Sequence, residues 1–144
     1  MNALRKVVNL SFWVVLSAVA VVVGGCAGMG MSNEVKLSGA QEVPPVTTGA
    51  SGSGTITVGA DKSVSGSVTT SGVAATAAHI HVAAPDKNGP VIIPLTKTSD
   101  NTWSVPAGAK LTDAQYESYK AGNLYVNVHS AANKGGEVRG QLKP

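Results

Sequence analysis

The chain contains three histidines, and their positions are the feature that most suggests chemistry. His79 and His81 flank Ile80 in a segment with strand character, so alternation places both imidazoles on one face of the strand. Residues two apart on a strand are separated by about 6–7 Å, because each residue advances the strand by ~3.3 Å. At that separation both rings can reach one metal ion, and imidazole is a good ligand for copper and zinc.

His129 completes the candidate metal site. Residues 124–129 (LYVNVH) alternate apolar and polar, which places Tyr125, Asn127 and His129 on the face away from the core. If this strand neighbours the one that carries His79 and His81, the three imidazoles converge on the outer surface. The sequence therefore suggests a copper or zinc site. The alternative, favoured by spacing alone, is that the histidines are separate surface or structural residues that hydrogen-bond to loops.

The last expected strand, residues 137–142, offers side chains that would support such a site. In a symmetric hairpin, Glu137 lies beside His129 and Arg139 lies beside Asn127. A carboxylate next to a metal-binding histidine can fix its tautomer, so Glu137, Asn127 and Arg139 are the candidate supporting residues. The alternative is that they only make polar contacts across the sheet, which contribute little to stability.

Short strands separated by turns must position these residues. Alternating or apolar segments predict strands at residues 55–58, 63–70, 74–82, 91–95, 102–105, 124–129 and 137–142. One short helix is expected at residues 113–121, because Thr112 and Gln115 have the spacing of a capping box. Seven or more strands in about 110 residues predict an all-β fold, a Greek-key β-sandwich or barrel of superoxide-dismutase-like or immunoglobulin-like type. Its core would be mostly aliphatic, with Trp103 as a plug.

The start of the chain has the parts of a secretory signal. Residues 1–9 carry two positive charges and no negative one, and residues 10–23 are largely apolar and uncharged. A run of this length is short for a helix that must cross ~30 Å of hydrocarbon, although a permanent anchor helix is the alternative. Val23-Gly24-Gly25-Cys26 resembles a bacterial lipobox, a signal in which the cysteine is acylated and becomes the first mature residue.

These features divide the chain into a lipoprotein signal peptide (1–25), a lipidated Cys26 with a flexible tether (26–34), and a folded domain (35–144). We expect export and a lipid anchor in the cell envelope. Ala27, in place of an aspartate, resembles the signal for the outer membrane in Gram-negative bacteria. Cys26 is the only cysteine, so the domain has no internal disulfide.

The charge distribution and the absence of known motifs argue against several classes of function. From Cys26 onward there are 9 basic residues (11 minus Arg5 and Lys6) and 8 acidic ones, with no basic cluster, which argues against nucleic acid as a partner. The sequence has no nucleophile elbow, P-loop or dinucleotide fingerprint, and nothing in it points to an organic cofactor.

Four segments of the sequence resemble the CHRD domain, which is named for its occurrence in chordin. They are LSGAQEVPPV (37–46), AHIH followed by NGPV (78–81 and 88–91), LYVNVHS (124–130) and GGEVRGQL (135–142). The resemblance spans residues 35–144 and implies an extracellular β-sandwich or barrel without established catalytic residues. The three histidines are also similar to copper ligands of copper/zinc superoxide dismutase. No further histidine is present to bridge a second metal, so dismutase activity is not expected.

Three functions stay open on the sequence. The first is a membrane-anchored, noncatalytic envelope module that binds an unknown protein or glycan. The second is a copper- or zinc-binding protein that uses His79, His81 and His129. The third, with less support, is a redox enzyme built on that metal.

Overall fold

Alternating side chains and frequent turns divide residues 31–144, the part of the chain that the computed structural model describes, into nine short strands and two short helices. The helices are the 3₁₀ helix η1 (Gly39–Gln41) and the α-helix α1 (Asp113–Lys120). The strands are β1 (Met31–Ser38), β2 (Ser51–Val58), β3 (Val64–Ser71), β4 (Ala75–Val82), β5 (Val91–Pro94), β6 (Thr96–Lys97), β7 (Thr102–Ser104), β8 (Leu124–Ser130) and β9 (Val138–Leu142).

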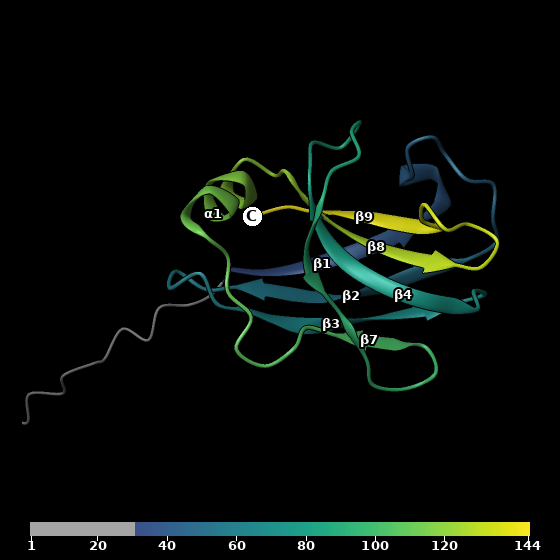
Figure 1. Cartoon of the computed structure of the whole chain (residues 1–144), viewed down its shortest axis with the longest axis horizontal. Helices are drawn as coiled ribbons and strands as arrows, with labels where there is room; N and C mark the ends of the chain where they lie inside the picture. The colour runs from purple at the N-terminus through teal and green to yellow at the C-terminus, as the bar shows by residue number, and fades with distance from the viewer. Residues whose placement is uncertain (1–30) are drawn as a thin grey trace, which may run out of the picture.

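All nine strands form one antiparallel sheet that curls into a nearly closed barrel (Figure 1). Their order is β5-β4-β8-β9-β1-β2-β3-β7-β6, with β5 and β6 at its two ends. Only Leu95 separates these end strands in the chain, and its amide donates to the carbonyl of Ala78 at 2.9 Å. The chain therefore passes directly from one end of the sheet to the other. The expectation of an all-β, barrel-like fold with a single short α-helix is confirmed.

Local hydrogen bonds stabilise two of the segments that connect the strands. Residues 59–62 lie between the strands expected at 55–58 and 63–70 and form the loop between β2 and β3, in which the Asp61 carboxylate accepts from the Ser63 amide at 3.1 Å. Helix α1 begins with the expected capping box: the Gln115 amide donates to the Thr112 hydroxyl, and the Thr112 amide donates to the Gln115 side chain. Together these caps satisfy two donors that the first turn would otherwise leave unpaired.

The first strand, β1, was not among the strands expected from the sequence. Residues up to 34 were expected to form a tether, yet β1 begins at Met31 and pairs with β2 along its whole length. Asn33 is buried, and its side-chain amide donates to the Tyr119 hydroxyl of α1 at 2.6 Å. This contact across 86 residues is invisible to local patterning. The two-residue strand β6, which pairs only with β7, was not expected because it is too short to show an alternating pattern.

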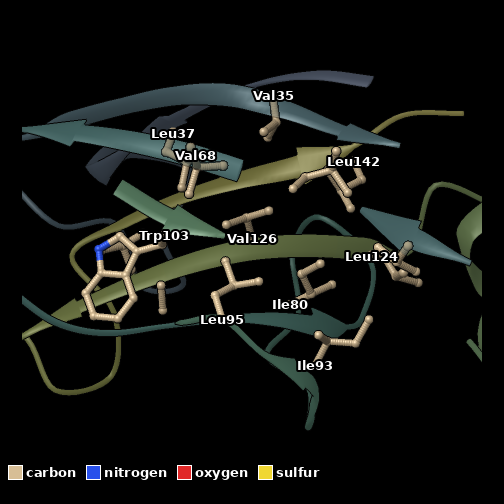
Figure 2. Packing of buried hydrophobic residues seen from close by; sticks show 14 of the residues in the cluster. Val35, Leu37, Val68, Ile80, Ile93, Leu95, Trp103, Leu124, Val126 and Leu142 are labelled. Atoms are coloured by element: carbon tan, nitrogen blue, oxygen red, sulfur yellow. The ribbon is translucent and has the colours of Figure 1, made fainter. Parts of the chain in front are cut away.

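The barrel interior is filled with aliphatic side chains from both halves of the sheet (Figure 2). Ile80, Val126 and Val68 are fully buried, and Trp103 is 5% exposed, in agreement with its expected role as a plug. No helix in residues 31–144 is long and apolar enough to span a membrane. The predicted signal peptide and the predicted lipidation site Cys26 lie outside the described residues.

Candidate metal centre

The strands that carry the three histidines are neighbours. β4 and β8 pair antiparallel, with His79 opposite Asn127, His81 opposite Tyr125 and His129 opposite Ala77. Ile80 and Val126 point into the core, so the histidines lie on the outer side of the sheet, as their alternation predicted. The condition on which the metal site depended, adjacency of these two strands, is therefore met.

The three imidazoles converge on one point. One nitrogen from each of His79, His81 and His129 lies within 4.8 Å of the other two. Three atoms at that limit lie at most 4.8/√3, or about 2.8 Å, from a common centre. Since metal–imidazole bonds are ~2.0–2.1 Å long, movements of less than about 1 Å would bring all three nitrogens into bonding range.

Backbone carbonyls fix which nitrogens are free to bind. Nδ1 of His81 lies 3.0 Å from the carbonyl oxygen of Gly89, and Nδ1 of His129 lies 3.0 Å from that of Lys134. A carbonyl only accepts, so Nδ1 carries the proton in each ring, and in a neutral ring Nε2 keeps its lone pair. Two Nε2 lone pairs are thereby held ready as ligands, with the carbonyls orienting the rings as such partners do in metal sites.

The unprotonated nitrogens of His129 and His81 differ in their surroundings. Nε2 of His129 lies 3.0 Å from Nδ1 of His79, which must donate its proton there because His129 has none to give at Nε2. Nε2 of His81 is buried and has no hydrogen-bond partner. Burying an acceptor without a partner costs folding free energy, because the atom loses its hydrogen bonds to water. A metal ion bound to this nitrogen would remove that cost.

Burial keeps the three rings neutral. It lowers the pKa of His79, His81 and His129 below the ordinary value of 6.5, and it is the largest cause for each. Repulsion from the other two rings lowers the pKa of His79 further, whereas the carbonyl partners of His81 and His129 oppose the shift. Because a metal binds only the deprotonated nitrogen, these shifts make the cluster available at neutral pH.

The site is less exposed than the expected surface position implied. His81 is only 8% exposed, and the loop 83–90, which lies above β4 in Figure 1, supplies the Gly89 carbonyl that contacts it. The Tyr125 ring stacks on the His81 ring, with centroids 4.9 Å apart and planes inclined by 9°. The Gly89 amide donates to the Tyr125 hydroxyl at 3.1 Å, so one loop residue holds both rings.

Arg139 lies opposite Asn127, as the symmetric hairpin predicted, and it anchors this loop. Its guanidinium donates to the carbonyls of Lys87 and Ala84 at 2.9 and 3.0 Å. It also covers the Tyr125 ring, with 3.5 Å between the guanidinium carbon and the ring centre. Arg139 is 1% exposed, so its charge is held inside the protein behind the His81–Tyr125 pair.

Glu137 and Asn127 do not bond to a histidine. The Glu137 carboxylate accepts from the Thr48 hydroxyl at 2.7 Å. The sequence suggested that Glu137 would be the partner of His129, but the Lys134 carbonyl is that partner. Asn127 donates to the Gly135 carbonyl at 3.3 Å. The tautomer of His129 is thus set by a loop carbonyl, which any residue type at position 134 can supply.

Sequence reasoning missed three residues that shape the site: Tyr125 as a stacking partner, Gly89 and Glu42. Gly89 belongs to the segment NGPV that resembles the CHRD domain, but the resemblance did not reveal its close packing: a Cβ at this position would collide with the carbonyl oxygen of Val82. Glu42 follows η1 and is 5% exposed beside Asn127 and Arg139. Burial raises its pKa to about 7, against the lowering effects of Arg139 and of the Asn127 hydrogen bond.

Residues 34–142 match the family model described as the CHRD domain. The match covers 109 of the 144 residues and includes all three histidines. No curated protein and no solved structure matches the chain significantly.

Proposed function

We propose that this chain, which belongs to the CHRD family, is a noncatalytic extracytoplasmic module that binds one copper or zinc ion through His79, His81 and His129. A lipid on Cys26 would anchor it to the cell envelope, at the outer membrane in a Gram-negative host. The observation that carries the proposal is that one nitrogen from each of the three imidazoles lies within 4.8 Å of the other two, with two of the rings oriented by backbone carbonyls.

The donor chemistry supports copper or zinc over harder ions. The cluster holds three imidazoles and, among the described residues, no carboxylate within the same range. Imidazole suits copper and zinc, whereas calcium and magnesium take oxygen ligands. Three protein ligands leave one position at a tetrahedral metal for water or for a ligand from a partner.

The short distance along the chain between anchor and domain supports a role at the membrane surface. Four residues separate Cys26 from Met31, where β1 begins. Even fully extended, five residue steps span at most ~18 Å, so a lipid on Cys26 would hold the domain against the headgroups. Substitution of Cys26 by serine should abolish incorporation of labelled palmitate, and unchanged labelling would refute the anchor.

A metal titration tests the central part of the proposal. The purified, metal-free protein is titrated with Cu(I), Cu(II) and Zn(II), beside a variant in which His79, His81 and His129 are all alanine. We expect one equivalent of at least one of these ions to bind tightly to the natural protein, and the variant to lose this binding. Equal affinity in the two proteins would refute the site.

Lys134→Ala is the matched control. The Lys134 side chain is exposed, while its backbone carbonyl, which holds His129, survives the substitution. Its metal affinity should therefore equal that of the natural protein.

Binding of an envelope protein or glycan is the second function that the sequence allows. In residues 33–144 the only large exposed hydrophobic residue is Val91, at 47%, so such a partner would be met mainly through polar contacts.

A further inference from the structure

We propose that the three-histidine site selects monovalent copper over Cu(II) and Zn(II), and that Arg139, fixed behind Tyr125, is the residue that sets this preference. The inference rests on the proposed function, since it names the ion that His79, His81 and His129 take. It adds a specificity residue that does not touch the metal.

The ligand set is neutral. Each histidine contributes an uncharged nitrogen, and no carboxylate of the described residues joins the cluster. A site of this kind leaves the full charge of the ion in place, which is one unit for Cu(I) and two for Cu(II) or Zn(II). Any fixed positive charge nearby therefore penalises the divalent ions by one additional unit of repulsion.

Arg139 supplies that fixed charge. Its guanidinium carbon lies 3.5 Å from the Tyr125 ring centre, which lies 4.9 Å from the His81 ring centre. The guanidinium is thus at most 8.4 Å (3.5 plus 4.9) from the ring of a ligand. Arginine stays protonated at neutral pH, and at 1% exposure it is poorly screened by solvent ions.

The surroundings of Arg139 leave most of this charge uncompensated. Its hydrogen bonds go to the carbonyls of Lys87 and Ala84 and to the side chains of Asn88 and Gln141, none of which is anionic. Besides the phenol of Tyr125, which the guanidinium covers, two acidic groups lie close enough to attract it, Glu42 and Asp86. The Asp86 side chain is 80% exposed, so solvent screens it.

Glu42 is the other candidate for compensation. Burial raises the pKa of its carboxyl to about 7, so the group is only partly ionised at neutral pH. It offsets Arg139 incompletely there and more fully at pH 8. Replacement of Glu42 by glutamine removes this negative charge and should raise the preference for Cu(I). Neutralisation of Arg139 should lower it.

Coulomb's law gives the size of the effect. For charges roughly 9–12 Å apart in a medium of effective dielectric constant ~20, one unit of additional repulsion corresponds to about a ten- to twentyfold change in affinity. The ratio of Cu(I) affinity to Cu(II) affinity should fall by about that factor in Arg139→Gln. It should stay close to the natural value in Arg139→Lys, which keeps the charge.

The experiment measures both affinities for the full-length protein at pH 8. Bathocuproine disulfonate competes for Cu(I) under anaerobic conditions, and nitrilotriacetate competes for Cu(II) and Zn(II). The natural protein is compared with Arg139→Gln, Arg139→Lys, Glu42→Gln and the control Lys36→Gln, which removes an exposed positive charge from β1. We expect the ratio to fall in Arg139→Gln, to rise in Glu42→Gln, and to stay constant in Lys36→Gln.

Other results of this experiment would contradict separate parts of the proposal. Equal loss of preference in Arg139→Gln and Arg139→Lys would show that the shape of the guanidinium matters and its charge does not. Tighter binding of Cu(II) or Zn(II) than of Cu(I) by the natural protein would refute the preference, even if no Arg139 variant folds, while leaving the metal site intact. Failure to bind any of the three ions would refute the proposed function itself.

Discussion

Replacement of Glu42 by glutamine should stabilise the metal-free protein far more at pH 8 than at pH 4. The Glu42 carboxyl is 5% exposed, and its Oε1 has no hydrogen-bond partner. Oδ1 of Asn127 is likewise buried and unpartnered, and both oxygens lie against Gly136. A glutamine at position 42 keeps the shape of the side chain, removes the buried charge, and can donate an N–H to the unpartnered Oδ1 of Asn127.

The magnitude follows from the pKa of Glu42, which burial raises from 4.5 to about 7 in the folded protein. Below pH 4.5 the carboxyl is protonated in the folded and unfolded chains alike. As the pH rises toward 7 the unfolded chain ionises first, which favours unfolding. Above pH 7 the carboxyl is ionised in both the folded and the unfolded chain, and the free energy of unfolding has fallen by its full amount. A shift of 2.5 units at 1.36 kcal/mol each amounts to about 3 kcal/mol.

Urea unfolding at pH 4 and pH 8, with a chelator present, measures this effect. The free energy of unfolding of the variant minus that of the natural protein should be about 3 kcal/mol larger at pH 8 than at pH 4. The comparison at each pH cancels the titration of the histidines, which both proteins share. A difference that does not change with pH, or a natural protein that is the more stable at pH 8, would refute the burial argument for Glu42.

Three further substitutions test separate parts of the structure. Gly89→Ala should weaken copper binding by tenfold or more, measured by chelator competition, because the loop must move the carbonyl that orients His81. Thr112→Ala should lower the free energy of unfolding by about 1 kcal/mol through loss of the helix cap, with copper affinity unchanged. Gly136→Ala should cost more than about 2 kcal/mol in urea unfolding, since Gly136 has φ of 135° and a Cβ would collide with Asn127.

Local patterning predicted the features that depend on neighbours in the sequence. Period-two alternation placed His79, His81 and His129 on one side of the sheet, because the pleat alone decides which way a side chain points. The helix start at Thr112 followed from the spacing of two capping residues. These inferences needed no knowledge of which strands pair.

The covering of the site could not be predicted in this way. Tyr125 is fully buried because the loop 83–90 folds over it, and that loop is held by Arg139, which follows it by about fifty residues. Contacts at such separation depend on the sheet order, which places β9 beside β8. The sequence pattern shows that Arg139 and Tyr125 share a face, but it contains no signal for what lies above that face.

X-ray absorption of the copper-loaded, full-length protein tests the metal site most directly. We expect one copper per chain with three imidazole nitrogens at ~2.0 Å, and loss of the imidazole signal when His79, His81 and His129 are replaced by alanine. A copper environment without three imidazoles, or one that survives these replacements, would contradict it.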